Sequence, residues 1–339
     1  MLVDFAAPVA ATPAEAETAA VSAEQVGYDG FNAAETRHDV FTTLTLVARA
    51  TGQISLQSAI AVAFARNPMN VAVLANDLQL ISEGRFRLGL GSQVKPHIER
   101  RFAMPWSSPA ARMEEFVGAV RAIWHSWATG ERLMFRGAFY RHTLMTEFFD
   151  PGPNPFGNPT IQLAAVGERM VATAGRVADG LLVHPLTSLA YLGERIIPAV
   201  REARGGTLDG FHLQMSPMVV LGAEPADRRK AERAVRGQIA FYASTPAYRP
   251  VLDLHGWGEL ADRLTALSRR QSWDEMADAV TDDMLDAFAV AGDPASVAAG
   301  LRERFGSTID RISFYTPYEA DRYQLAAVRS AIRTSALSG

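Results

Sequence analysis

The sequence contains no cysteine. This absence excludes disulfides, thiolate metal sites and cysteine nucleophiles together, and it says little about the cellular compartment. Seven histidines are present, but none stands in an HExxH or comparable cluster, so we expect no metal site. A G-x-S-x-G elbow, a P-loop and a G-x-G-x-x-G fingerprint are also missing, which argues against acyl transfer, nucleotide hydrolysis and Rossmann-type NAD binding.

Strong positive charge and long apolar runs are missing as well. The net charge is −4 and the longest basic run is Arg228-Arg229-Lys230, so neither nucleic acid nor an anionic membrane is expected as a partner. The N-terminus has no basic segment followed by an apolar run, and no stretch of about 18 uncharged apolar residues occurs. We therefore expect a soluble cytoplasmic protein with a small-molecule substrate.

What is present is a regular alternation of strand-like and helix-like segments. The 339 residues, of which 48% are hydrophobic and 21% charged, suffice for two domains or for one large α/β barrel. Helices are predicted at residues 14–26, 41–50, 68–82, 108–129, 167–177, 187–204, 225–242, 294–305 and 320–336. The strands predicted between them are residues 2–8, 31–34, 53–64, 84–91, 160–165, 180–183, 212–221 and 309–315.

This alternation favours a parallel sheet, because strands such as residues 59–64 are apolar on both faces. Eight strand–helix units in this length suggest one (β/α)8 TIM barrel over residues 1–339, with an open doubly wound sheet as the alternative. Two segments interrupt the alternation. One is a hairpin and proline-rich stretch at about 130–159, and the other is a helical insertion at 244–293.

A barrel of this kind places its functional residues at the carboxyl ends of its strands. Glu35 directly follows a buried strand, where a carboxylate costs free energy unless it is paired or functional. His38 either titrates in catalysis or pairs with Asp39 at a helix start. His184 comes before a proline and is interpreted as the end of a strand. The other candidates are Thr36, Arg37, Ser92, Gln93, Lys95 and His97.

Two turns at the same end of the barrel are suited to an anion. Gly91-Ser92-Gln93 follows the fourth strand, and Val166-Gly167-Glu168-Arg169-Met170 opens a helix after the fifth. Free backbone N–H groups and the positive end of a helix dipole bind phosphate. A glycine turn can also be purely structural, but two such turns near one rim favour a phosphate-bearing cofactor that spans them.

Several segments resemble the bacterial-luciferase-like superfamily of flavin and deazaflavin monooxygenases. They are Gly27-Tyr28-Asp29-Gly30 with Glu35-Thr36, residues 59–64 with Arg66-Asn67-Pro68, residues 84–91, and Ala165-Val166-Gly167 with Ala178-Asp179-Gly180. Further strings resemble an actinobacterial branch of oxidoreductases that use coenzyme F420. They are residues 91–95, 98–102, 104–106, 238–242 and 244–246.

The resemblance covers essentially the whole chain and implies a TIM barrel with a cofactor at its mouth. It also implies that a bulged third strand braces the isoalloxazine-type ring, with a non-prolyl cis peptide at Ala59–Ile60. Relatives pair as homodimers through the helix at 71–81, which carries Leu74, Leu78 and Ile81, and through the helix before strand 3. Many relatives have a catalytic histidine directly after the strand-2 acid, and here Thr36 holds that position.

The function expected from this resemblance is an F420-dependent oxidoreductase that passes a hydride between the deazaflavin and a small organic substrate. An FMN-dependent monooxygenase is the alternative, and a barrel without a cofactor is the third. We expect His38 as acid or base, Thr36 as an orienting donor, Glu35 as a support for His38, and His97 as the reserve. The expected cofactor-binding residues are Ala59, Ile60, Gly91, Ser92, Gln93, Val166, Gly167, Glu168, Arg169 and Met170.

Overall fold

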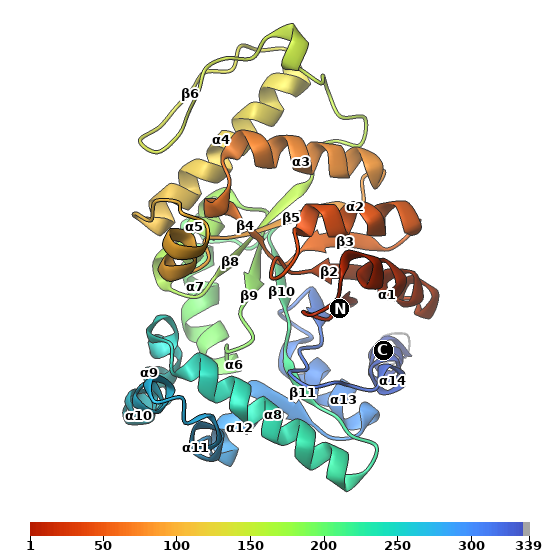
Figure 1. Cartoon of the computed structure of the whole chain (residues 1–339), viewed down its shortest axis with the longest axis vertical. Coiled ribbons are helices and arrows are strands. Elements are labelled where there is room, and N and C mark those ends of the chain that lie inside the picture. The colour runs from red at the N-terminus through yellow and green to blue at the C-terminus, as the bar shows by residue number, and fades with distance from the viewer. Residues whose placement is uncertain (335–339) are drawn as a thin grey trace.

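Eight parallel strands close into a ring at the centre of the computed structural model, which describes residues 1–334 (Figure 1). Their hydrogen-bonded order is β3-β2-β1-β13-β10-β9-β8-β5, and a pairing of β3 with β5 closes the ring. This confirms the TIM barrel rather than the open sheet. The bounds are β1 (Leu2–Ala6), β2 (Gly30–Ala33), β3 (Ser55–Ser58), β5 (Phe86–Gly91), β8 (Thr160–Ala165), β9 (Gly180–Val183), β10 (His212–Met215) and β13 (Arg311–Ser313).

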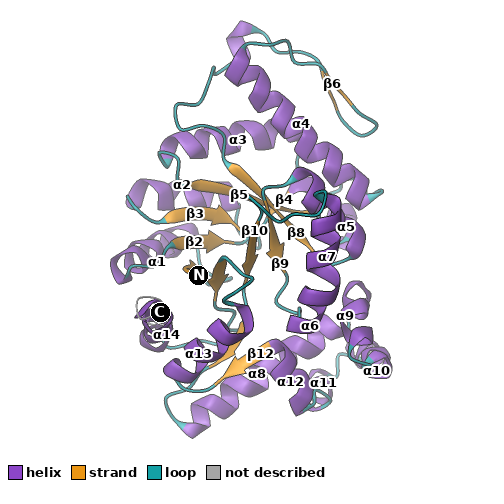
Figure 2. Cartoon of the chain, turned by 180° about the vertical axis from the view of Figure 1, so that it is seen from behind, coloured by secondary structure: helices purple, strands orange, loops and turns teal. Residues whose placement is uncertain are grey.

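Helices surround the barrel and α8 to α12 gather at one side of it (Figure 2). Local signals explain where several begin. Thr12 forms a capping box with Glu15, and Asp39 and Asn67 cap the next two helices. The bounds are α1 (Pro13–Val26), α2 (Val40–Ala50), α3 (Pro68–Ile81), α4 (Pro109–Thr129), α5 (Glu168–Val177), α6 (Leu189–Tyr191), α7 (Ile197–Ala203), α8 (Pro225–Ala243), α9 (Arg249–Leu254), α10 (Gly258–Arg269), α11 (Trp273–Asp278), α12 (Asp282–Phe288), α13 (Pro294–Phe305) and α14 (Arg322–Thr334).

Most predicted helices are confirmed to within a few residues. The helix predicted at 187–204 consists of α6 and α7, joined by a π-helical turn at Leu192–Ile196. The helix predicted at 320–336 begins at Arg322, and its positions 335 and 336 lie outside the described residues. The predicted hairpin is confirmed as β6 (Phe135–Arg136) paired with β7 (Arg141–His142).

One predicted strand and one predicted helical segment need correction. The strand predicted at 212–221 ends at Met215, and its second part, β11 (Met218–Val220), leaves the barrel. Pro217 separates the two parts, and its carbonyl accepts a hydrogen bond from the Tyr315 amide instead (2.9 Å). β11 pairs with β12 (Ala289–Ala291), a strand that lies inside the segment predicted to be helical. Three residues are too few for a strand period to be visible in the sequence.

The interior of the barrel near the amino-terminal ends of its strands contains a polar network around Asp4, which is fully buried. Arg311 binds both Asp4 oxygens, and the Arg87 Nη2 lies 3.1 Å from Oδ2. Burial lowers the pKa of Arg87 to about 10, although Asp4 opposes this shift. Buried charges are tolerated when they are paired in this way. The network closes the amino-terminal end of the barrel, so the opposite end carries the site.

Candidate active site

The third barrel strand is interrupted where it reaches the mouth. β3 ends at Ser58, a cis peptide joins Ala59 to Ile60, and β4 (Ala61–Val62) resumes the pairing with β5. The expected bulge and its cis bond are therefore confirmed. The backbone of Ser58 approaches Gly89 so closely that a Cβ on Gly89 would lie 1.8 Å from the Ser58 carbonyl oxygen. Glycine is required at position 89 for this reason.

Glu35 stabilises the same bulge through hydrogen bonds. Its Oε2 accepts a hydrogen bond from the Val62 amide and binds the Arg66 guanidinium, both at 2.7 Å. Arg66 also pairs with Asp39 at 2.5 Å. Burial alone raises the pKa of Asp39, but hydrogen bonds from Thr42 and the charge of Arg66 outweigh burial and hold it below its usual value. Both carboxylates are therefore directed to Arg66, and the predicted support of His38 by Glu35 or Asp39 is not the arrangement seen.

The turn after β5 lies against the bulge. A Cβ on Gly91 would lie 2.8 Å from the side chain of Ile60, so glycine lets Ile60 pack over this turn. Gln93 has a φ of 60°, which is uncommon for a residue other than glycine. Its own Oε1 accepts the Val94 amide (3.0 Å), and Ser92 Oγ donates to the Gln93 carbonyl (3.1 Å). Side chains of the turn thus stabilise it locally.

A cavity of about 970 Å³ lies between the first turns of α4 and α5, and neither the bulge at Ala59–Ile60 nor residues 91–93 line it. Neither helix has a side-chain cap: α4 follows Ser108 and α5 follows Gly167. The first backbone N–H groups of α5 are therefore available to an anion, whereas α4 begins with Pro109, which has no N–H, and offers only those that follow it. A Cβ on Gly167 would meet open space. Four of the residues predicted to bind the cofactor line this cavity: Gly167, Glu168, Arg169 and Met170.

The predicted acid–base residues lie elsewhere. His38 is exposed and, with Thr36, lines a cavity of about 20 Å³ between the loops that follow β1 and β2. The Thr36 hydroxyl donates to the Val9 carbonyl (3.1 Å). His97 is exposed at the start of a π-helical turn. Thr36 and His38 thus line one cavity, and the turn that begins at His97 contacts their loop through Arg101, which donates to the Thr36 carbonyl (2.5 Å).

An aromatic cluster at the mouth was not predicted. His184 follows β9, and its ring stacks on Tyr248 with centroids 4.4 Å apart, while Tyr242 meets it edge-on at 4.6 Å. The Tyr242 and Tyr315 hydroxyls lie 3.0 Å apart. All four side chains are partly buried. The only sequence signals were His184 at a strand end and Tyr242 in a string of the F420 branch, since Tyr248 and Tyr315 carry no motif.

Burial keeps this cluster uncharged. It lowers the pKa of His184 to about 3 and raises that of Tyr248 to about 12. Burial also raises the pKa of Tyr315, and burial together with the neighbouring Tyr315 raises that of Tyr242. At neutral pH the cluster therefore consists of one neutral imidazole and three neutral phenols, which are hydrogen-bond donors rather than charges.

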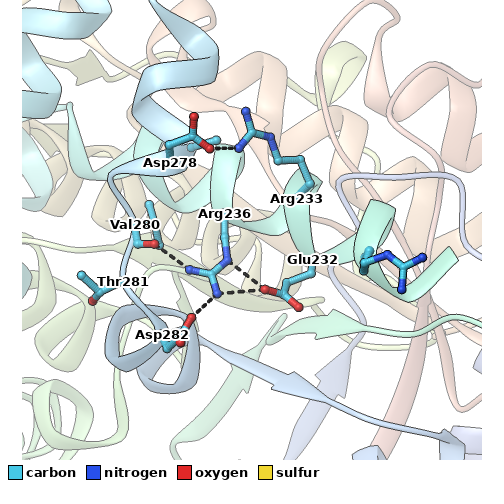
Figure 3. Close-up of a pocket in the computed structure, with 9 residues that line it drawn as sticks. Glu232, Arg233, Arg236, Asp278, Val280, Thr281 and Asp282 are labelled. Atoms are coloured by element: carbon cyan, nitrogen blue, oxygen red, sulfur yellow. Dashed lines mark hydrogen bonds and ion pairs between the residues drawn. The ribbon is translucent and has the colours of Figure 1, made fainter. Parts of the chain in front are cut away.

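A third hollow, of about 610 Å³, lies between α8 and the segment from α11 to α12 (Figure 3). Two of its three arginines are paired within it: Arg236 binds Glu232 (2.8 Å), the Val280 carbonyl (2.6 Å) and Asp282, and Arg233 binds Asp278. We assign it no chemistry. Within residues 1–334, no group of three or more histidine, aspartate or glutamate side chains is arranged to hold a metal ion. Over the same residues, no helix is long and apolar enough to cross a membrane.

Comparison with known proteins defines the class. The model of the luciferase-like monooxygenase family matches residues 3–311. The chain belongs to this family, as the resemblance in its sequence implied. An uncharacterized protein of Mycobacterium tuberculosis is 49% identical over 302 residues, which are 88% of this chain and 89% of the relative. The 5,10-methylenetetrahydromethanopterin reductase of Archaeoglobus fulgidus is 28% identical, over 84% of this chain and 83% of the relative.

Solved structures share the fold. The coenzyme F420-dependent tetrahydromethanopterin reductase of Methanopyrus kandleri superposes with a TM-score of 0.81 at 19% identity, over 98% of this chain and 99% of the reductase. A type II Baeyer-Villiger monooxygenase of Pseudomonas putida in complex with FMN gives 0.68 at 16% identity, over 98% of both chains. Proteins of this fold thus include an F420-dependent reductase and an FMN-bound monooxygenase. Membership of the luciferase-like monooxygenase family makes this chain an oxidoreductase or monooxygenase.

Proposed function

We propose that the protein is an F420-dependent oxidoreductase that transfers a hydride between the deazaflavin and a small organic substrate. The observation that carries this proposal is the cavity between α4 and α5, where two helices without side-chain caps begin. Similarity to the reductases of A. fulgidus and M. kandleri supports F420, because the second of them is F420-dependent. The cavity volume of about 970 Å³ lies within the range of small-molecule and cofactor sites.

The residues present fit such a cofactor. The open space at Gly167 lets a phosphate approach the first N–H groups of α5, where the helix dipole favours negative charge. Arg169 adds positive charge at the same rim, although Glu168 also lines it. We infer that Ala59 and Ile60 back the ring from the bulge, with Gly91 holding Ile60 in place.

The class of cofactor determines which parts of the reaction the cofactor and the protein each carry out. When bound, the deazaflavin supplies or accepts the hydride at C5. The protein orients the substrate, excludes water, and transfers a proton that neutralises the charge developed on the substrate. Glu35 acts on the bulge rather than on the substrate, because Val62 and Arg66 occupy its oxygen. The residues expected from the sequence to move the proton, His38 and Thr36 with His97 as the reserve, do not line the cavity between α4 and α5.

An FMN-dependent monooxygenase is the second candidate, and the FMN-bound structure of similar fold supports it. The same helix start serves the phosphate of either cofactor, so the two candidates differ in their chemistry. The test is turnover without oxygen: the protein is mixed anaerobically with reduced F420 and a panel of small ketones, aldehydes and enones. Loss of the reduced-F420 absorbance is the expected result. Product that forms only with reduced FMN and oxygen overturns the proposal in favour of the monooxygenase.

A further inference from the structure

The hydrogen bonds of the aromatic cluster have a fixed direction at His184. Its Nδ1 lies 3.0 Å from the Leu186 amide, which can only donate. Nδ1 must therefore be the unprotonated nitrogen, so the neutral imidazole carries its proton on Nε2. That proton faces Tyr248 Oη at 2.9 Å. The phenol oxygen of Tyr248 accepts, and its own proton has no acceptor among the described residues.

A second free proton belongs to the pair of Tyr242 and Tyr315. Their hydroxyl oxygens lie 3.0 Å apart, so one O–H donates to the other oxygen. Burial raises the pKa of Tyr242, but a side-chain hydrogen bond from Gln238 acts to lower it, as a bond donated to the phenol oxygen does. Tyr242 in turn donates to Tyr315, and the Tyr315 proton is left over. Tyr248 and Tyr315 are close enough for the charge of one to affect the other. Tyr248 and Tyr315 are thus two partly exposed phenols at the mouth, and each has a hydroxyl proton with no protein acceptor among the described residues.

The position of the cluster relative to the bulge is set by the strand order. In the closed ring, four steps from β3 in either direction lead to β10. His184 follows β9 and Tyr315 follows β13, and these two strands flank β10. The cluster thus faces the bulge across the mouth. A cofactor ring held against the bulge would leave its other side open toward the phenols, and a substrate would bind between them.

We propose that Tyr248 and Tyr315 form a two-donor site for the carbonyl or alkoxide oxygen of a small ketone or secondary alcohol. Tyr242 and His184 are positioning residues in this assignment, since they act through the other two. The proposal rests on the proposed function, which it deepens by naming the substrate class. Neutral donors suit a neutral carbonyl and the negative charge that develops on its oxygen. A carboxylate substrate fits less well, because the cluster contains no cation.

The step balances as a ketone reduction. The carbonyl carbon accepts a hydride from the reduced deazaflavin, and a new C–H bond forms as the carbonyl π pair moves onto oxygen. That oxygen then takes the proton of the Tyr248 hydroxyl, and solvent returns a proton to Tyr248. The secondary alcohol is the reduced product, and the deazaflavin is left oxidised. The reverse sequence oxidises the alcohol.

The test is the carbonyl stretch of bound cyclohexanone, labelled with 13C at the carbonyl carbon, in the infrared difference spectrum. It is read in the protein alone and in its complex with oxidised F420, where no hydride can be transferred. Two hydrogen bonds should lower the stretch below its value in water. Tyr248→Phe and Tyr315→Phe should each move it part of the way back, and the double variant should abolish the shift. Each single change should weaken cyclohexanone binding about tenfold, as expected for one lost hydrogen bond of about 1.4 kcal/mol.

Three further measurements make the outcome decisive. Tyr323→Phe removes an exposed phenol from α14 and should change nothing. Tyr242→Phe should shift the stretch less than Tyr315→Phe, because its hydroxyl acts through Tyr315. An unchanged stretch in Tyr248→Phe and Tyr315→Phe, or no binding of cyclohexanone to either form, overturns the assignment. A failure of the proposed function can be distinguished from a failure of the two-donor site. It appears as a lack of F420 binding in a titration without ketone.

Discussion

The hydroxyl of Ser58 makes two hydrogen bonds to the backbone of Gly89: Oγ accepts the Gly89 amide and donates to the Gly89 carbonyl, both at 2.9 Å. These bonds replace the ladder that is lost where β3 gives way to the bulge. The Glu35 carboxylate has the same role at β4, beyond the cis peptide, because it accepts a hydrogen bond from the Val62 amide. The mouth is therefore shaped by side chains that substitute for strand pairing.

Gly89→Ala should destabilise the protein by about 3 kcal/mol or more, the upper range for forcing an extra methyl group into a packed core. The new Cβ would lie 1.8 Å from the Ser58 carbonyl oxygen, and backbone cannot yield as a side chain can. Denaturant unfolding measures the loss. Gly52→Ala is the control, because its Cβ meets no atom within 4 Å. Equal stability of the two variants would contradict this account of the bulge.

Gly167→Val should weaken cofactor binding at least tenfold, about 1.4 kcal/mol, while leaving the fold intact. A Cβ there enters open space, so the branched side chain projects into the cavity and obstructs the phosphate. Fluorescence titration of F420 measures the affinity. Gly52→Val makes the same change where the chain approaches β3 from the amino-terminal end, and it should bind F420 normally. If folded Gly167→Val bound F420 with unchanged affinity, the phosphate would not bind at this helix start.

Stability should fall as the pH drops below about 6.5, in part because of His184. Burial lowers its folded pKa to about 3 from the ordinary 6.5. Between these values the unfolded chain binds a proton that the folded chain does not, so acid favours unfolding. At pH 5 the cost is about 2 kcal/mol relative to pH 7. His184→Gln should remove that part of the acid loss in urea unfolding at the two pH values, whereas the same substitution at exposed His97 should not. Equal acid loss in wild type and His184→Gln would show that His184 titrates normally.

His38→Asn tests the acid–base role expected from the sequence. If His38 moves the proton, turnover should fall about a hundredfold or more with cofactor binding unchanged. Its exposed place between the β1 and β2 loops leads us to expect turnover within about threefold of wild type instead, a change of under 1 kcal/mol. The measurement is kcat with a ketone found in the anaerobic screen. A hundredfold loss would return the role to His38.

We also propose a homodimer that pairs through α3. Leu74 and Ile81 are 37% and 36% exposed there, and Val73 and Leu80 are similarly open, whereas Leu78 is buried in its own barrel. Light scattering at micromolar concentration should give twice the chain mass. Leu74→Arg with Ile81→Arg should give the mass of one chain, and Val26→Arg, at the exposed end of α1, should leave the dimer intact. A wild-type monomer would decide against this interface.

The sequence predicted the barrel because alternation of apolar strands with helices is a local signal, and the rim turns at Gly91 and Gly167 follow from it. β12 was missed because three residues carry no period. The aromatic cluster was missed for another reason. His184 and Tyr248 are 64 positions apart, and their contact exists only once the 244–293 insertion folds back over the mouth. Which donors meet there depends on tertiary packing, and no local pattern encodes it.

The central claim is that the mouth binds F420, and an equilibrium titration of the purified protein with F420 and with FMN, in parallel, tests it most directly. The account predicts that F420 binds at least tenfold more tightly than FMN, a difference of about 1.4 kcal/mol or more. It also predicts that the difference shrinks in Gly167→Val. Tighter binding of FMN, or no binding of F420 by protein that is folded, would contradict it.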